Sequence, residues 1–536
     1  MPAPALDVEA LLRHYDTPAA CAAELLCDAH DPDAIAFTII GADLSSEDIT
    51  YGQLRERSEQ GAAALAELGI GRGDCVATLM GKSADLVVML LAIWRRGAIH
   101  VPLFTAFAWP AIELRLVSSG TKVIICDANQ RQKIEETTAT VLVAGGQATT
   151  PDLALAQLLD SQQPGIPAEA VGGDGTLVII FTSGTTGTPK GVPVPLRALA
   201  AFRQYVELGL DVREDDVFWN AADPGWAYGL YYGILGPLAA GRRSLLLQAG
   251  YSPELSFAVL ERFRVTNFAA APTIYRTMRS KAAAAPKDLS LRRASSAGEP
   301  LTPEVISWSE QTFGVPVRDH YGQTEHGMMI INAWHDDIRK DLRPGSMGHP
   351  LPGWTCAILK DASDEPAAPE EMGRVAVDAT ASPLMWFTGY KDAEEKTAER
   401  FSADGRWYIT GDAGKVDEDG YFFFSSRDDD VIIMAGYRIG PFDVESVLSM
   451  HPAVQESAVI GAPDELRGEV LEAYVVLAEG TTGGDALAAE LQNLVKTQLS
   501  AHAYPRKVHF VEVLPKTPSG KLQRYVLRER RAAQPE

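Results

Sequence analysis

The stretch Thr182-Ser183-Gly184-Thr185-Thr186-Gly187-Thr188-Pro189-Lys190-Gly191 is the most informative part of this 536-residue chain. It follows the apolar run Leu177 to Phe181, so we expect a buried strand that opens into a loop of small residues, hydroxyls and one lysine. Glycine lets a backbone approach a polyphosphate closely, while backbone N–H groups, hydroxyls and a lysine amine supply donors and positive charge. The spacing differs from a Walker A loop, which needs Gly, four residues and then Gly-Lys-Ser/Thr. The stretch predicts a phosphate-binding loop, although a flexible surface loop has a similar composition.

The composition bounds the class of protein. A hydrophobic content of 46% and a charged content of 22% are ordinary for a globular protein, and the length predicts two to four domains. The net charge of -23 argues against duplex nucleic acid or an anionic membrane as the main partner, because both favour a basic face. Anionic small molecules stay possible, since local basic residues can override the global charge.

The cysteines and the N-terminal residues bear on the compartment. The five cysteines are scattered and lack CxxC spacing, which predicts neither a disulfide framework nor a zinc site. Residues 1–16 contain acidic residues and no basic region followed by an apolar core, and no apolar run approaches about 18 residues. We therefore expect a cytoplasmic protein without a membrane span.

Alternating helix and strand patterns dominate the first part of the chain. We expect a helix at 51–68, a strand at 75–80, a helix that Ser83 caps and Gly97 ends, and a strand at 123–126. Such alternation predicts an α/β domain with a largely parallel sheet. Residues 129–172 are polar and irregular, which is typical of a peripheral excursion.

The pattern changes near the charged run Ser425 to Asp430, where a short linker is expected. The residues after it alternate strands with helices at 444–450 and 486–499, the size of a small α+β domain. We therefore predict an N-terminal domain at 1–429 and a C-terminal domain at 430–536. Gly483 to Leu487 is similar to the attachment site of a carrier domain but lacks its serine, so a turn before a helix is expected there.

Four later motifs accompany the loop in a fixed order. They are Tyr321-Gly322-Gln323-Thr324-Glu325, Tyr408-Ile409-Thr410-Gly411-Asp412, the segment Arg427 to Arg438, and Pro515-Lys516-Thr517-Pro518-Ser519-Gly520-Lys521. Together the five resemble the signatures of the adenylate-forming superfamily, in its acyl-CoA synthetase branch, over nearly the whole chain. The resemblance implies an α/β fold with a large multi-sheet N-terminal adenylation domain and a small mobile α+β C-terminal domain. It also implies ATP, Mg²⁺ and coenzyme A as cofactors and co-substrates, and a monomer or homodimer.

The resemblance assigns residues to the activation of a carboxylate by ATP. That reaction brings two anions together, so the site must neutralise charge and hold the groups in line. Lys521, Lys190 and Glu325 would be catalytic, with Glu325 the magnesium ligand. Asp412 would accept hydrogen bonds from the ribose hydroxyls, and Arg427 would hold ribose and phosphate. The other nucleotide-binding residues would be the loop Thr182 to Gly187, Arg438, Gly298, Glu299, Pro300, Asp319, His320, Tyr321, Gly322, Gln323 and Thr324.

The family's small domain rotates after the adenylate forms and then admits a thiol. Asp429 would be the hinge, where a charged, solvated run has few packed contacts to break. Residues similar to those that the family uses for CoA are Ala435, Gly436, Tyr437, Arg467, Tyr504 and Arg506. Surface arginines are common, however, and solvated arginines are the alternative for the last group.

The segment Asp223-Pro224-Gly225-Trp226 resembles the acyl-pocket segment of acetyl-CoA and medium-chain acyl-CoA synthetases. Acetate enzymes carry a second tryptophan where this chain has Gly322. An absent indole frees on the order of 200 Å² of contact surface, enough for several methylenes at about 0.8 kcal/mol each. We therefore predict a medium-chain, branched or aromatic acid rather than acetate. The predicted acyl pocket consists of Trp226, Tyr228, Gly229, Gly322, His326 and Gly327, whereas Met328 and Met329 are expected to pack in the core.

Three alternatives stay open at this stage. A related ligase could stop at the acyl-adenylate or load a carrier protein, and a luciferase-type oxygenase shares the motifs. From another class, the protein could be a catalytically silent nucleotide-binding regulator. A metal hydrolase is not indicated, because the ten histidines show no HExxH or comparable spacing.

Overall fold

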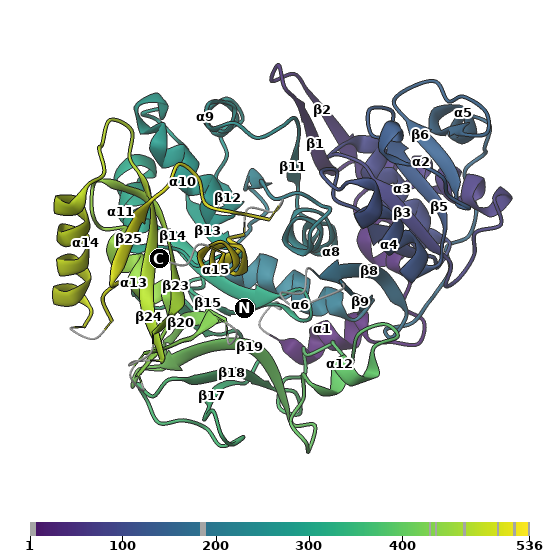
Figure 1. Cartoon of the computed structure of the whole chain (residues 1–536). Coiled ribbons are helices and arrows are strands. Elements are labelled where there is room, and N and C mark those ends of the chain that lie inside the picture. Colours follow the sequence, from purple (N-terminus) through teal and green to yellow (C-terminus); the bar gives the residue numbers. More distant parts are fainter. Residues whose placement is uncertain are drawn as a thin grey trace.

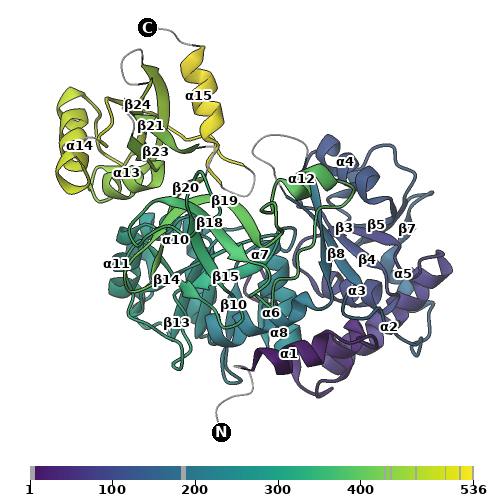
Figure 2. The same cartoon turned by 90° about the horizontal axis from the view of Figure 1, so that it is seen from below.

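The computed structural model describes residues 7–182, 189–427, 430–434, 437–464, 468–500, 503–517 and 521–533, except the side chains at 437, 438 and 468. Figures 1 and 2 show a large body that contains two sheets and a small body at the C-terminal end of the chain, built on a third sheet. The predicted fold class, a large multi-sheet α/β domain followed by a small α+β domain, is confirmed.

A seven-stranded sheet carries the predicted phosphate loop. Its strands run parallel except for the last pair, β8 and β9, which form an antiparallel hairpin around the loop. In sheet order they are β7 (Leu153–Ala154), β6 (Thr140–Ala144), β5 (Thr121–Asp127), β3 (Cys75–Leu79), β4 (Ile99–Pro102), β8 (Thr176–Thr182) and β9 (Lys190–Pro195).

Two of these strands correct the sequence analysis. Residues 129–172 are not a peripheral excursion, because β6 and β7 complete the sheet and the side chains of Val141, Leu142 and Val143 are buried. β6 has only five residues and lies between polar linkers. Its hydrophobic pattern is therefore too short to predict a strand from the sequence.

A thirteen-stranded sheet forms the rest of the large body. The strands that lie between β1 and β14 in the sheet are parallel to their neighbours. The strands that lie between β15 and β17 in the sheet are antiparallel to theirs. In sheet order its strands are β17 (Cys356–Leu359), β18 (Gly373–Asp378), β19 (Trp407–Val416), β20 (Phe422–Arg427), β16 (Ser346–Pro350), β15 (Gly327–Ile331), β14 (Val317–Gln323), β13 (Arg293–Ala297), β12 (Asn267–Ala270), β10 (Phe218–Asn220), β11 (Ser244–Gln248), β1 (Ile35–Gly41) and β2 (Ser46–Thr50).

The helices of the large body begin at residues that the sequence marks. The predicted Ser83 cap is confirmed, since Ser83 Oγ accepts from the Leu86 N–H at 3.1 Å. Thr50 and Gln53 form a capping box at the start of the helix predicted over 51–68. The helices are α1 (Val8–Tyr15), η2 (Glu24–Asp28), α2 (Tyr51–Glu67), α3 (Ala84–Arg95), α4 (Trp109–Ser119), η3 (Arg131–Lys133), α5 (Leu155–Asp160), α6 (Ala198–Gln204), η4 (Tyr205–Gly209), α7 (Ala227–Leu230), η5 (Tyr231–Leu235), α8 (Gly236–Ala240), α9 (Pro253–Arg262), α10 (Pro272–Ser280), η6 (Ala282–Ala284), α11 (Pro303–Phe313) and α12 (Glu394–Ala398).

The small body holds the third sheet. The thirteen-stranded sheet ends with β20 at Arg427, and the third sheet begins with β21 at Ile432. Its strands and helices are β21 (Ile432–Met434), β22 (Tyr437–Ile439), α13 (Pro441–Leu448), β23 (Val454–Asp464), β24 (Gly468–Leu477), α14 (Asp485–Gln498), β25 (Lys507–Phe510) and α15 (Arg524–Ala532). Gly484 is the N-cap of α14, which confirms the predicted turn before a helix.

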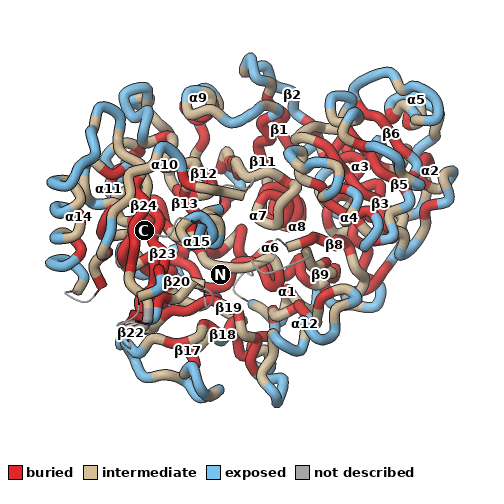
Figure 3. The backbone as a smooth tube through the Cα atoms, viewed as in Figure 1, coloured by how far each residue is buried: buried red, intermediate tan, exposed pale blue. Residues whose placement is uncertain are grey.

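The two bodies touch through a few polar and aromatic contacts. Ser425 Oγ donates to Asp443 Oδ2 at 2.7 Å, and Ser449 Oγ donates to Glu304 Oε2 at 2.8 Å. The burial view in Figure 3 shows that each body has its own buried interior, with the exposed positions on outer helices and loops. Within the described ranges, no helix is both long and apolar enough to span a bilayer.

A buried ion pair fixes α15 to the rest of the small body. The Arg524 guanidinium donates to both carboxylate oxygens of Glu445 at 2.7 and 2.8 Å and reaches Asp430 at 3.3 Å. Arg528 donates to the same Asp430 at 2.7 Å but is half-exposed. Residue 430 and α13 are therefore tied to the helix that follows Lys521.

We predict that Arg524→Met destabilises the protein by about 3 kcal/mol, because Glu445 would keep its charge in a buried site without a cation. Arg528→Met is the matched control and is expected to cost under about 1 kcal/mol, since solvent screens its pair. Urea unfolding followed by circular dichroism measures both. Equal losses for the two variants would contradict the prediction.

Candidate functional site

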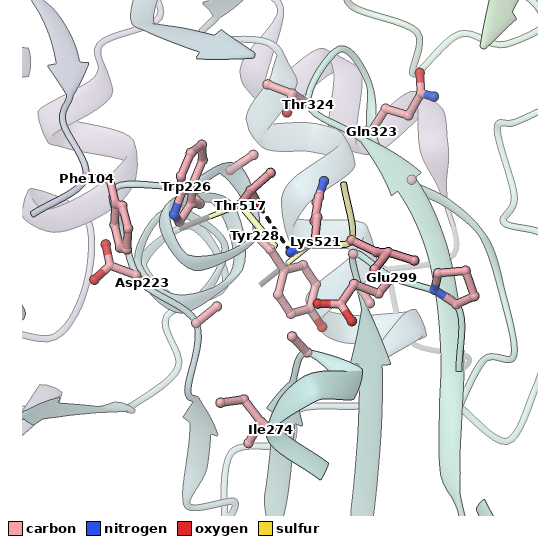
Figure 4. A pocket seen from close by; sticks show the side chains of 18 of the residues that line it. Phe104, Asp223, Trp226, Tyr228, Ile274, Glu299, Gln323, Thr324, Thr517 and Lys521 are labelled. Atoms are coloured by element: carbon pink, nitrogen blue, oxygen red, sulfur yellow. Dashed lines mark hydrogen bonds between the residues drawn. The ribbon is translucent and has the colours of Figure 1, made fainter. Parts of the chain in front are cut away.

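A cavity of about 1600 Å³ lies where the two large sheets and the small body meet. Its wall contains residues that follow parallel strands at their carboxyl ends: Lys82 after β3, Thr105 after β4, Asp127 at the end of β5 and Gly298 after β13. Ligands of open α/β sheets bind outside this edge. Figure 4 shows the interior of the cavity, with Lys521 among residues of the large body.

The predicted phosphate loop opens into this cavity. Thr182 and Lys190, at its two ends, pair across the hairpin, and both line the wall. Residues 183–187, assigned to phosphate binding, lie outside the described residues. Lys190 Nζ lies 4.9 Å from the centre of the Tyr390 ring. Burial lowers the pKa of Lys190, and the neighbouring Arg400 guanidinium lowers it further, so cationic groups concentrate at this end.

Asp412 is a buried carboxylate of the site with partners from two other strands. It is buried and accepts from the Tyr321 hydroxyl at 2.5 Å and from Gln323 Nε2 at 2.7 Å. Asp412 and Arg427 are opposite residues of the β19–β20 pair, and this register brings Arg427 Nε within 3.2 Å of Asp412 Oδ1. Three of the predicted motifs therefore meet at one carboxylate.

Glu325 is buried at the cavity wall, where the Tyr390 hydroxyl donates to its Oε1 at 2.7 Å. In the part of the chain that the structure describes, no group of three or more His, Cys, Asp or Glu side chains could hold a metal ion. Glu325 could thus contribute a single protein ligand to a hard cation that keeps its other ligands from phosphates and water.

The segment predicted to contact the adenine lines the same cavity. Gly298 has φ +99°, a conformation that favours glycine. The Glu299 carboxylate is held by α10, where Thr273 Oγ1 donates at 2.9 Å and Arg276 donates at 2.6 Å. Lining the wall with them are Pro300, Asp319, His320, Tyr321, Gly322, Gln323 and Thr324.

Lys521 comes from the small body and enters the cavity (Figure 4). Its backbone N–H donates to Thr517 Oγ1 at 3.0 Å, which closes the loop before α15. Solvent reaches the Lys521 side chain through the cavity. The surrounding protein nevertheless lowers the pKa of the Lys521 amine by desolvation, and the Arg427 guanidinium lowers this pKa further. The carboxylates that raise it, and so interact with the amine, are those of Glu299, Asp412 and Glu325.

Trp226 and Tyr228 line the predicted acyl end of the cavity, with Gly322 and Gly327. The Trp226 ring packs 5.2 Å from the Phe104 ring. A Cβ at Gly322 would lie 2.1 Å from the Gly327 carbonyl oxygen on the neighbouring strand. Close strand packing therefore also requires this glycine, and its absent side chain is not simply free acyl volume.

Two predicted acyl-pocket residues do not line the cavity. A Cβ at Gly229 would lie 2.1 Å from the Asp223 carbonyl oxygen, so Gly229 serves the packing of α7. His326 is fully buried behind the wall, next to the Tyr408 ring at 5.6 Å, and burial lowers its pKa to about 4. Met329 packs in the core as expected, whereas Met328 is buried and also lines the cavity.

The predicted CoA face is only partly described. Tyr504 and Arg506 lie on the small body, with the Arg506 guanidinium 3.9 Å from the centre of the Tyr504 ring, and neither lines the cavity. The other assigned positions lie outside the described residues or have undescribed side chains: Asp429, Ala435, Gly436, Tyr437, Arg438 and Arg467.

Comparison with known protein families decides what this arrangement represents. The family model described as "AMP-binding enzyme" matches residues 27–390, more than half of the chain, and the model described as "AMP-binding enzyme C-terminal domain" matches residues 443–521. The chain belongs to the AMP-binding enzyme family. The recognised resemblance to adenylate-forming acyl-CoA synthetases is thereby confirmed.

Several relatives of this AMP-binding enzyme are named as CoA ligases or CoA synthetases. An acetyl-coenzyme A synthetase of Bacillus subtilis (strain 168) is 36% identical over 492 residues, which cover 90% of this chain and 85% of the relative. The crystal structure of a Brucella canis acyl-CoA synthetase shares 42% identity, with a TM-score of 0.77 and coverage of 98% and 97%. The anthranilate CoA ligase AuaEII in complex with anthranoyl-AMP shares 28%, with a TM-score of 0.87 and coverage of 96% and 99%. The chain is an AMP-forming acid–thiol ligase.

Some cavity residues of the AMP-binding enzyme escaped the sequence analysis. Arg400 and Tyr390 interact with Lys190 and Glu325, and Tyr232 lies under the acyl end. They stand outside the motifs, and an isolated arginine or tyrosine gives no local signal in one sequence. Only the packing of distant segments brings them to the cavity.

Asp319 gives a pH-dependent prediction for the ligand-free protein. Burial raises the pKa of the Asp319 carboxyl to about 7, far above its value in an unfolded chain. Below about pH 4 both states hold the proton, and between about pH 4 and 7 only the folded state does. The contribution of Asp319 to stability is therefore lost as the pH rises to about 7.

We expect Asp319→Asn, which cannot ionise, to gain stability relative to the wild type as the pH rises from 5 to 7, by up to about 1.4 kcal/mol per pH unit. Urea unfolding at several pH values measures this difference. A difference that is independent of pH would contradict it.

Proposed function

We propose that this enzyme joins a carboxylic acid to coenzyme A in two steps. In the first, a carboxylate oxygen attacks the α-phosphorus of ATP, the bond to pyrophosphate breaks, and an acyl-adenylate forms. In the second, the CoA thiolate attacks the acyl carbon and AMP leaves. The observation that carries the proposal is the position of Lys521, which a separate body brings into the cavity that Lys190, Glu325 and Asp412 line.

Charge neutralisation is the main task of the site in the first step. Lys521 would stabilise the charge that grows between the carboxylate and the α-phosphate, and such groups contribute most in the transition state. Lys190, with Thr182 and residues 183–187, would hold the β- and γ-phosphates. Arg400 adds a further cation at this end.

Mg²⁺ fits the donor set at Glu325. One buried carboxylate without further acidic partners suits an ion that keeps phosphate oxygens and waters as ligands. The ion would neutralise phosphate charge when bound. Tyr390 would orient Glu325 through its hydrogen bond.

The nucleoside would lie along β14 and β19. Asp412 would accept from the ribose hydroxyls, and Arg427 would contact ribose and phosphate, with Arg438 as a further contact. The adenine would lie against residues 298–300 and 319–324, which share one wall of the cavity.

The second step would follow a rotation of the small domain about Asp429, between domains 1–429 and 430–536. Support for this hinge is the change of sheet between Arg427 and Ile432. Rotation would present a CoA face that consists of Ala435, Gly436, Tyr437, Arg467, Tyr504 and Arg506.

The unpaired state of all five cysteines, each of which is described, supports a reducing, cytoplasmic location.

The acid is proposed to be medium-chain, branched or aromatic rather than acetate. Support comes from the aromatic wall of Trp226 and Tyr228 and from the small residue at 227. The relative that binds anthranoyl-AMP shows that this fold accommodates an aromatic acyl group, whereas the Bacillus relative is named for acetate.

Lys521→Ala is expected to lower acid-dependent ATP–pyrophosphate exchange at least about 100-fold in a folded protein, because it removes transition-state charge stabilisation. Lys516→Ala is the matched control. Lys516 precedes Lys521 in the same segment but does not itself line the cavity, and its amine is paired with Glu456 at 2.6 Å, so exchange should stay near the wild-type rate. Full exchange activity of Lys521→Ala would refute the proposed role.

AMP release with a panel of acids tests the reaction and the acid class together. We expect CoA-dependent AMP formation and a kcat/KM for medium-chain or aromatic acids at least about tenfold above that for acetate, because additional buried methylenes contribute about 0.8 kcal/mol each. A maximum at acetate would overturn the acid class alone. AMP release that requires a phosphopantetheinylated carrier protein instead of CoA would favour the carrier-loading ligase, and no exchange with any acid would favour a silent regulator.

A further inference from the structure

A chain of hydrogen bonds runs from the backbone of the thirteen-stranded sheet to the acyl end of the cavity. His320 on β14 contacts Tyr205 at the start of η4, with His320 Nδ1 and Tyr205 Oη 2.7 Å apart. The Tyr205 hydroxyl lies 3.1 Å from the hydroxyl of Tyr228 on α7. Tyr205 is buried and does not line the cavity, His320 is buried at its wall, and Tyr228 lines it (Figure 4).

The hydrogen bond between His320 and the Asn332 backbone fixes the tautomer of His320. Its Nε2 lies 3.2 Å from the Asn332 backbone carbonyl oxygen, which can only accept, so Nε2 carries the proton. Burial lowers the pKa of His320 to about 3, so the ring is neutral at working pH. A neutral imidazole with its proton on Nε2 has only an acceptor at Nδ1.

The acceptor at His320 Nδ1 decides which hydroxyl donates in each of the other two hydrogen bonds. The Tyr205 hydroxyl must donate its single proton to His320 Nδ1, so towards Tyr228 it can only accept. The Tyr228 hydroxyl then donates to Tyr205. Burial raises the pKa of the Tyr228 phenol, and the Asp319 carboxyl adds to this effect, so the phenol keeps the proton that it donates.

We propose that Tyr228 is a specificity-determining residue that offers the acyl chamber a hydrogen-bond acceptor and no donor, and thereby selects acids with a neutral hydroxyl or amino group. This inference rests on the proposed function. A substrate donor completes the chain, whereas a keto, ether or second carboxylate group meets lone pairs and leaves its own acceptor unsatisfied, which is costly in a buried site.

The surroundings of Tyr228 favour a neutral donor. The Tyr232 ring lies 5.5 Å from the Tyr228 ring in a T-shaped arrangement, and Tyr232 Oη already accepts from the Met328 N–H at 2.7 Å. The carboxyl group of Asp319 on β14 raises the pKa of Tyr228, and it repels an additional anion when it is ionised. An acid with a second carboxylate is therefore disfavoured.

Pyrophosphate exchange tests the inference without involving CoA. Sets of acids are compared that are identical except for one group placed at successive positions. This group is a hydroxyl, methoxy or keto group, and in the aromatic acids also an amino group, which is neutral there. For the wild type we expect at least one position at which the hydroxy- or amino-substituted acid has a kcat/KM about tenfold above that of its methoxy and keto counterparts. A factor of about ten corresponds to the free energy of one neutral hydrogen bond.

Two isosteric variants separate a directional role from a structural one. Tyr228→Phe removes the acceptor, so the ratio of kcat/KM between hydroxy or amino acids and their methoxy or keto counterparts should fall to near unity, whatever happens to the overall rate. Tyr205→Phe removes the group to which Tyr228 donates, so the Tyr228 hydroxyl can turn and donate into the chamber, and the preference should shift towards keto and methoxy acids. Tyr421→Phe is the matched control, because the Tyr421 hydroxyl donates to the Asp341 carbonyl at 2.8 Å outside the cavity.

The outcomes are distinct. A folded Tyr228→Phe that keeps the wild-type preference, or a folded Tyr205→Phe that does not change it, would overturn the inference. Exchange with unsubstituted acids but no preference at any position would overturn it and leave the proposed function intact. Exchange with no acid at all would overturn both.

Discussion

The structure depends on one buried carboxylate on β19 that side chains from two other strands, β14 and β20, satisfy. Asp412 accepts from Tyr321 and Gln323 on β14 and pairs with Arg427, its cross-strand neighbour on β20. A buried carboxylate is costly unless donors surround it, so these bonds fix the antiparallel half of the large sheet against its parallel half. Arg427 is also the last residue of that sheet before the small body begins. The interaction that orders the nucleoside end of the cavity therefore also anchors the junction between the two bodies.

The cavity gathers several cations although the chain as a whole is acidic. The chain carries a net charge of -23, yet Lys190, Arg400, Arg427 and Lys521 all line one cavity, together with several carboxylates. Loss of solvation lowers the pKa of both lysines. Cations in partly desolvated surroundings act on a bound anion more strongly than they would in water. The net charge of the chain therefore does not decide whether this cavity can bind an anion.

Much of the fold and part of the site were predictable because the signals are local. Caps such as Ser83, the helix over 51–68 and the small α+β body depend on neighbouring residues, and the structure confirms them. Predictions failed where long-range packing decides. Residues 129–172 supply two strands of the sheet, and Gly229 and His326 pack behind the cavity wall instead of lining it. A motif fixes the order of residues along the chain, but the side of a wall that a residue faces depends on the neighbouring strands.

The sequence by itself determined the alternation of elements, the family and the residue types of the anion site, because these follow from local patterns and from spacing along the chain. Tertiary structure alone decided which of those residues share a cavity, and it added Arg400, Tyr390 and the chain from His320 to Tyr228. The reason is that hydrogen-bond direction and desolvation depend on groups that approach from other elements. Tyr205 lies 115 residues from His320 in the sequence, and only the folded structure sets the proton order from Asn332 through His320 to Tyr205.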